Sequence, residues 1–147
     1  MADELIAWSD DFSVCNEVID RQHKGLITMT NEFYAGCQRN EYLVKVYFLK
    51  TLQGAVNYAK THFVAEEEVM RRADYPDLAA HKVEHDNFSV HVMEQVKIFE
   101  NEPNPDPASF VKMLMDWILH HVAECDKKYA PYIVKLDQQS LAAGSGV

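Results

Sequence analysis

The sequence predicts an all-α protein: an antiparallel up-down-up-down four-helix bundle with an N-terminal arm. Three observations predict it. Apolar residues recur at helical spacing in four long segments, the breaks between these segments are short, and 147 residues suit a single domain with a real core. Four long helices with short connections pack as antiparallel neighbours. The four apolar stripes cover residues 19–37, 44–69, 81–99 and 110–121.

Polar and helix-breaking residues separate the stripes. Residues 38–41 are polar, residues 74–77 (Asp-Tyr-Pro-Asp) indicate a stop and a restart, and three prolines fall within residues 101–107. The breaks therefore place one helix in each stripe.

The two ends of the chain differ from the stripes. About 15 residues at the start lack a clean period, so we expect them to form the arm across the bundle. Residues 132–136 are expected to add one or two turns. The bundle domain is thus assigned to residues 1–136, and residues 137–147, with their small side chains, to a flexible tail.

The composition excludes several classes of function. A formal net charge of −9 argues against nucleic acid and anionic membrane surfaces as partners. No apolar run approaches the roughly 18 residues that span a bilayer, so no membrane partner is expected. The N-terminus lacks the basic start and apolar core of a secretory signal, which favours a cytoplasmic protein. Three distant cysteines without a C-x-x-C pattern indicate reduced thiols.

Seven side chains that can bind metal lie on or beside the stripes. Two pairs have the spacing H-x-x-x-E or H-x-x-x-H, which puts both side chains on one helix face, about 5–6 Å apart at Cβ. Side chains so placed converge on one metal ion, or one binds while the other bridges. The seven candidates are His23, His62, Glu66, His81, His85, His121 and Asp126.

The size of this set indicates two metal ions. A lone histidine on an apolar face is more often a hydrogen-bonded core residue, but five of them on four helices are costly to bury without a shared partner. Imidazole and carboxylate without thiolate suit iron, manganese or zinc, and a structural zinc site needs only four ligands. Two six-coordinate ions offer about twelve positions, and the seven side chains with a bridging oxygen fill all but about one. The sequence therefore predicts a two-metal centre that is open to one small molecule.

Several segments also match a known family. They are Asp20-Arg21-Gln22-His23, His62-Phe63-Val64-Ala65-Glu66-Glu67 followed by Met70, Tyr75-Pro76, His81-Lys82-Val83-Glu84-His85, Trp117, and His121-Val122-Ala123-Glu124-Cys125-Asp126-Lys127-Lys128-Tyr129. Through these segments the chain resembles the hemerythrins, in particular the bacterial ones. The resemblance implies a non-haem di-iron centre that binds dioxygen reversibly, in an oxygen carrier, an oxygen store or a sensor domain.

The resemblance also implies a role for each candidate. One iron (Fe2+/Fe3+) would be bound by His81, His85 and His121. The other would be bound by His23 and His62 and would keep the open position for dioxygen. The irons would be bridged by an oxo or hydroxo group and by two carboxylates, those of Glu66 and Asp126.

One of these roles conflicts with ideal helix geometry. His121 and Asp126 lie five residues apart, which is about 140° around a regular α-helix. Glu124 would be better placed on such a helix, although the family pattern selects Asp126. We therefore predict a wide turn here, of the kind often found at functional sites.

The ligand shell favours binding of oxygen over its activation. Ferritin-like di-iron oxygenases use four glutamates and two histidines, and their anionic shell stabilises high-valent iron. A shell of mostly neutral imidazole disfavours such states. Four apolar or aromatic residues lie within about a turn of the ligands and are candidates for an oxygen pocket, with core packing as the alternative: Ile27, Trp117, Ile118 and Val122.

The remaining polar candidates are expected to lie outside the centre. His91 is offset from its stripe, and His120 shares the face of Glu124 rather than that of His121. Three acidic residues are expected to face solvent, although one of them could hydrogen-bond a ligand imidazole: Glu67, Glu68 and Glu84.

Three function classes stay open at this stage. Reversible oxygen binding for storage, transport or delivery is the leading hypothesis, and it is not an enzymatic activity. An oxygen- or redox-sensing module of a signalling protein is the second. A di-iron enzyme that consumes peroxide or nitric oxide is the third. The small-residue tail keeps the sensor hypothesis open, and no protein partner can be named from the sequence.

Overall fold

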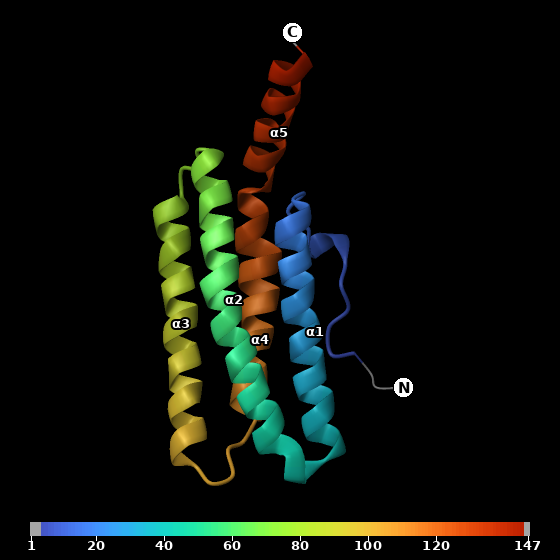
Figure 1. Cartoon of the computed structure of the whole chain (residues 1–147), viewed down its shortest axis with the longest axis vertical. Coiled ribbons are helices and arrows are strands. Elements are labelled where there is room, and N and C mark those ends of the chain that lie inside the picture. Colours follow the sequence, from blue (N-terminus) through green and yellow to red (C-terminus); the bar gives the residue numbers. More distant parts are fainter. Residues whose placement is uncertain (1–3, 146–147) are drawn as a thin grey trace.

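The computed structural model describes residues 4–145, and it is helical throughout its regular structure (Figure 1). Four long helices lie side by side, and each runs antiparallel to the next along the chain. This confirms the predicted four-helix bundle. The helices are α1 (Glu17–Arg39), α2 (Val44–Arg72), α3 (Leu78–Asn101) and α4 (Ala108–Asp116), which continues as a π-helix over Trp117–Cys125.

The connections fall where the sequence places them. A short 3₁₀ helix, Glu41–Leu43, joins α1 to α2, and the Asn40 side chain caps it by accepting from the Tyr42 amide at 2.9 Å. Asp74 takes a left-handed conformation (φ 53°) in the turn between α2 and α3, where the chain reverses sharply. Residues 102–107 join α3 to α4 and carry the three prolines.

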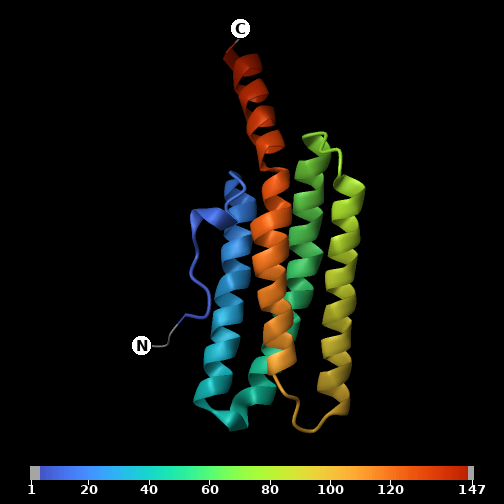
Figure 2. The ribbon, with the colours of Figure 1, turned by 180° about the vertical axis from the view of Figure 1, so that it is seen from behind.

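The N-terminal segment forms the predicted arm. It lies along α1 (Figure 2) and contains a 3₁₀ helix, Asp10–Phe12. Asn31 of α1 holds the arm by two hydrogen bonds, since its side chain accepts from the Ile6 amide at 2.9 Å and donates to the Ile6 carbonyl at 2.7 Å. Ile6 and Phe12 are buried in the main core. The arm is therefore part of the packed structure.

The C-terminal segment differs from the expectation. After a 3₁₀ turn (Asp126–Lys128), α5 runs over Ala130–Ser145 and projects past the end of the bundle (Figure 1). Residues 137–145 are thus helical, because leucine, glutamine and alanine favour helix and outweigh the small residues near the end. Residues 146–147 of the expected tail lie outside the described residues. A domain boundary near residue 136 and a flexible segment beyond it stay predictions.

The core changes character along the bundle axis. At the end where α1 meets α2 and α3 meets α4, it is a set of phenylalanine rings, with Phe33, Phe48 and Phe110 at 5.2–5.7 Å between ring centroids. Towards the other end it becomes polar. Among residues 4–145, no helix is long and apolar enough to cross a membrane.

Candidate metal centre

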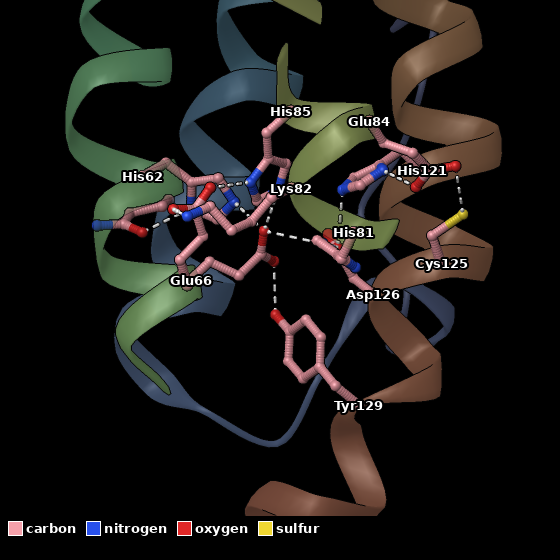
Figure 3. A network of polar contacts seen from close by, with 12 residues as sticks. His62, Glu66, His81, Lys82, Glu84, His85, His121, Cys125, Asp126 and Tyr129 are labelled. Carbon is pink, nitrogen blue, oxygen red and sulfur yellow. Dashed lines mark hydrogen bonds and ion pairs between the residues drawn. The ribbon is translucent and has the colours of Figure 1, made fainter. Parts of the chain in front are cut away.

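The polar part of the core gathers all seven side chains that the sequence selects. Each of the four helical segments of the bundle contributes at least one of them (Figure 3). All are buried, with exposed fractions of 5% or less. The seven are His23, His62, Glu66, His81, His85, His121 and Asp126.

The π-helix explains how Asp126 reaches the centre. Its wider turns span Trp117–Cys125, which confirms the predicted irregularity, and they bring His121 and Asp126 to the same side. Nε2 of His121 lies 3.0 Å from Oδ1 of Asp126. The side chain of Glu124, by contrast, is 70% exposed. The geometry therefore places Asp126 at the centre and Glu124 outside it.

The first group of ligand atoms comes from α2, α3 and the π-helix. Glu66, His81, His85 and His121 each offer an atom within 4.8 Å of the others. Oε2 of Glu66 lies 2.8 Å from Nε2 of His85. Oδ1 of Asp126 completes the group, at 3.0 Å from Nε2 of both His81 and His121. Five side chains thus surround this position.

The second group lies beside the first and shares its carboxylates. It comprises His23, His62, Glu66 and Asp126, again within 4.8 Å of one another. Oδ2 of Asp126 is 3.1 Å from Nε2 of His23, and Oε2 of Glu66 is 3.5 Å from Nε2 of His62. Asp126 therefore turns one oxygen to each group. Four side chains surround this second position, one fewer than the first.

Several of these atoms lack a hydrogen-bond partner among the described residues. They are buried, and they belong to the side chains that form the two groups: Nε2 of His81, Nε2 of His121, and Oδ1 and Oδ2 of Asp126. Buried polar atoms are almost always paired, because an unpaired one costs about 1–3 kcal/mol. Neutral imidazole nitrogens and carboxylate oxygens are ligand atoms for iron, manganese and zinc. The residues present therefore fit a pair of such ions.

Hydrogen bonds from a second layer orient three of the imidazoles. Nδ1 of His62 donates to Oε1 of Gln22 at 2.7 Å. Nδ1 of His85 donates to Glu67 at 2.9 Å, and Nδ1 of His121 donates to Glu84 at 2.9 Å. Each bond holds a proton on Nδ1, so that the Nε2 lone pair would be the one to bind a metal.

The structure also shows where the remaining polar candidates lie. Of the three acidic residues expected at solvated positions, Glu67 and Glu84 are half-buried and bonded to ligand imidazoles, whereas Glu68 pairs with Arg71 on the surface. His91 and His120 are exposed, as predicted. The acidic second layer is thus larger than the sequence indicates.

Cys125 belongs to this second layer and not to the ligands. Its thiol lies 3.6 Å from Oε1 of Glu84 and donates to it, although Glu84, His121 and Cys125 together could form a further group of ligand atoms. Burial, followed by the neighbouring Glu84 carboxylate, raises the pKa of Cys125 to about 11. The thiol therefore keeps its proton. All three cysteines are free, as predicted.

Aromatic rings cover the imidazoles on their outer faces. Phe63 stacks on His85 with 3.9 Å between centroids, and Trp117 stacks on His121 at 3.8 Å. Rings packed in this way exclude water from the ligand histidines.

Two tyrosines complete the site: sequence reasoning named Tyr129 only as part of a matching segment, and it missed Tyr58. Tyr58 stacks on His62 with 4.6 Å between ring centroids. The hydroxyl of Tyr129 donates to Oε1 of Glu66 at 2.6 Å. Their spacing could have revealed them, since Tyr58 lies one turn before His62 and Tyr129 follows Asp126 by three residues.

Burial and the two carboxylates shift the pKa values of the ligand side chains in different directions. Burial lowers the pKa of His23, but the adjacent carboxylates of Asp126 and Glu66 outweigh it and raise this pKa to about 9. The same balance raises the pKa of His81 to about 9. Burial dominates at His62 and lowers its pKa. For Glu66, burial raises the pKa, yet hydrogen bonds from the surrounding histidines hold it well below its usual value. Without metal, the centre therefore retains protons on some histidines and negative charge on Glu66.

The four proposed pocket residues lie in the main core. Ile27, Ile118 and Val122 are at most 4% exposed, and Trp117 packs against the same cluster. A cavity of about 260 Å³ between α1 and α2 reaches His62 and Tyr58 from the surface. A contact between these residues and oxygen stays a prediction.

Comparisons with known proteins agree with this geometry. Residues 16–133 match the family model described as the hemerythrin HHE cation binding domain. A bacteriohemerythrin of Methylococcus capsulatus is 33% identical over 134 residues, which cover 86% of this chain and 95% of the relative. A bacteriohemerythrin of Stenotrophomonas maltophilia is 31% identical over 130 residues, covering 88% and 82%.

A myohemerythrin and a solved hemerythrin structure match as well. A myohemerythrin of Theromyzon tessulatum is 31% identical over 126 residues, covering 86% of this chain and 92% of the relative. A crystal structure of wild-type hemerythrin superposes with a TM-score of 0.75 at 27% identity, over 88% of this chain and 98% of that one. The chain belongs to the hemerythrin family.

Proposed function

We propose that this protein holds two iron ions and binds dioxygen reversibly. The observation that carries the proposal is the unequal division of the ligands, with five side chains around the first position and four around the second. If an oxo or hydroxo bridge adds one ligand to each, a six-coordinate first ion is complete and the second keeps one place open. Family membership supports iron as the metal and dioxygen as the ligand.

Each side chain then has a defined task. His81, His85 and His121 hold the first ion, and His23 and His62 hold the second. Glu66 and Asp126 bridge the two, which agrees with the placement of one Asp126 oxygen near each group. Bound iron would supply the electrons that dioxygen takes up and returns.

The rest of the site favours binding over catalysis. Imidazoles bound to metal are neutral ligands, and the stacked rings of Phe63 and Trp117 cover those of His85 and His121. Ile27, Ile118 and Val122 offer no proton to a molecule beside them. A site with few proton donors releases dioxygen more readily than it reduces it further.

An optical experiment tests this function. The anaerobic, reduced protein should gain a new absorption band in air and lose it again when oxygen is removed. Ile118→Asn should shorten the life of the oxygenated form more than Ile118→Ala, because it adds a polar donor, with iron content unchanged. A protein that never shows a reversible band, but consumes reductant and oxygen steadily, would be a di-iron enzyme.

One observation favours a sensor role as the second candidate. Tyr129 joins Glu66 to the segment that leads into α5, and α5 projects beyond the bundle. A change at the centre could therefore move α5. Hydrogen exchange in α5 that differs between the reduced and oxygenated forms would support this role, and identical exchange would exclude it.

A further inference from the structure

Tyr58 occupies a particular place at the centre. It lies on α2 one turn before His62, and the two rings are nearly parallel, with 17° between their planes. The residue is only 7% exposed. His62 belongs to the second group, which has four side chains, whereas Asp126 brings the first group to five. Tyr58 therefore stands on the side of the centre where a ligand position is left open.

The hydroxyl of Tyr58 has an unused proton. Its oxygen accepts a hydrogen bond from Nε1 of Trp117 at 3.3 Å. An indole nitrogen can only donate, so the Tyr58 proton must point elsewhere. Within residues 4–145, no acceptor for that proton is found. A buried donor without an acceptor is costly and therefore rare.

Tyr129 provides the contrast. It too is a buried tyrosine beside the ligand set, but its hydroxyl gives its proton to Oε1 of Glu66 at 2.6 Å. Trp117 already donates to Tyr58, and the nearby apolar residues have no donor. Of the two tyrosines, only Tyr58 has a proton left for a further molecule.

We propose that the Tyr58 hydroxyl donates a hydrogen bond to the external ligand at the open side of the His23–His62 group. The hydroxyl makes the site selective for small ligands with acceptor lone pairs, small anions above all. This inference rests on the proposed function, because it needs the two-metal centre. It also adds a polar contact to a pocket that the sequence predicts to be apolar.

The first test uses the metal-free protein. The chain has two tryptophans, so its NMR spectrum should show two indole N–H signals. Tyr58→Phe removes the acceptor of the Trp117 indole and should shift that signal upfield, while Trp8 serves as the internal reference. An unchanged Trp117 signal would mean that the Tyr58 hydroxyl accepts no hydrogen bond from the Trp117 indole. The inference that the Tyr58 proton is available to a ligand would then be wrong.

The second test uses the iron-loaded, oxidised protein with azide as the probe. Tyr58→Phe should weaken azide affinity about tenfold or more, since hydrogen bonds to charged acceptors are the stronger ones. Tyr47→Phe is the matched control, because it makes the same change on the same helix three turns away. Iron content and circular dichroism should be alike in all three proteins.

An infrared measurement separates a hydrogen bond from a merely structural role. The antisymmetric stretch of bound azide should shift in D₂O for the wild type and for Tyr47→Phe, but not for Tyr58→Phe. If the variant folds poorly, the D₂O shift of the azide stretch in the wild type still tests whether bound azide accepts a hydrogen bond. Equal affinity and an equal D₂O shift in Tyr58→Phe would overturn the inference. A wild-type protein that takes up no iron would overturn the proposed function instead, whatever the NMR experiment shows.

Discussion

The two ends of the bundle are filled in opposite ways. At one end, phenylalanine rings from three helices pack against one another, and Phe33, Phe48 and Phe110 are at most 1% exposed. At the other end, seven side chains able to bind metal occupy the equivalent inward positions. The first end gains free energy by removing apolar surface from water, whereas the second must recover the cost of burying polar groups. One scaffold thus combines an end that apolar packing stabilises with an end whose buried polar groups a bound metal would stabilise.

The largest effect should come from removing a shared ligand. Glu66→Ala takes away the carboxylate that serves both groups, so we expect nearly complete loss of iron, measured by metal analysis of the purified protein. His91→Ala, an exposed histidine on α3, is the control and should bind iron as the wild type does.

Phe33→Ala makes the comparison complete. It should lower the free energy of unfolding by about 3–5 kcal/mol, as large-to-small changes of buried aromatic residues do, yet leave iron content near normal. Equal loss of iron in Glu66→Ala, His91→Ala and Phe33→Ala would show that the two ends are not separate in function and that the ligand assignment is wrong.

The next effect concerns pH and should have opposite signs with and without metal. In the metal-free protein the pKa of His23 and of His81 is raised to about 9, from about 6.5 when unfolded. The stability that these histidines contribute is therefore complete below about pH 6.5 and is lost as pH rises towards 9. The pKa of Glu66 is lower in the folded protein than in the unfolded chain. The stability that Glu66 contributes is therefore lost in acid, as the pH falls below the pKa of the unfolded chain.

Urea unfolding at about pH 6 and about pH 9 measures this difference. The metal-free protein should lose stability on going from pH 6 to pH 9, on the order of a few kcal/mol. The iron-loaded protein should keep or gain stability over the same range, because metal binding requires neutral imidazoles and releases their protons. A metal-free protein that becomes more stable towards pH 9 would contradict the pairing of His23 and His81 with the carboxylates.

The two ends also differ in how far sequence could foresee them. Helical periodicity was enough for the four helices and for the inward positions of the ligands, since the period of a helix fixes its buried face. The conflict between His121 and Asp126 even predicted the wide turn that the π-helix provides. These features depend on spacing within one segment, which a sequence displays directly.

The features that the sequence left open or did not reveal depend on contacts between segments. Glu67 on α2 bonds to His85 on α3, and Glu84 on α3 bonds to His121 on the π-helix. Because each partner lies on another helix, each glutamate has the spacing of a surface residue along its own helix. The unused proton of Tyr58 is visible only once Trp117 is seen to occupy its oxygen. The length of α5 was underestimated because its far part projects past the bundle and carries no buried stripe.

The second layer gives the smallest of these effects and the sharpest comparison among similar residues. Glu84→Ala removes the acceptor that orients His121, and partners of this kind usually contribute about 10–100-fold to metal affinity. Glu68→Ala is the matched control, since Glu68 lies on α2 but bonds only to Arg71 at the surface. Competition with a chelator should give weaker Fe2+ binding for Glu84→Ala and wild-type binding for Glu68→Ala.

A third variant separates the hydrogen bond from the charge. Glu84→Gln keeps an oxygen that can accept from Nδ1 of His121 but loses the negative charge that makes the imidazole a stronger donor to the metal. Its affinity should fall between those of the wild type and Glu84→Ala. If Glu84→Gln matches Glu84→Ala, charge alone matters; if it matches the wild type, orientation alone does. If Glu84→Ala itself binds Fe2+ as Glu68→Ala does, His121 is held by its stacking on Trp117 and the acidic second layer has no part in metal binding.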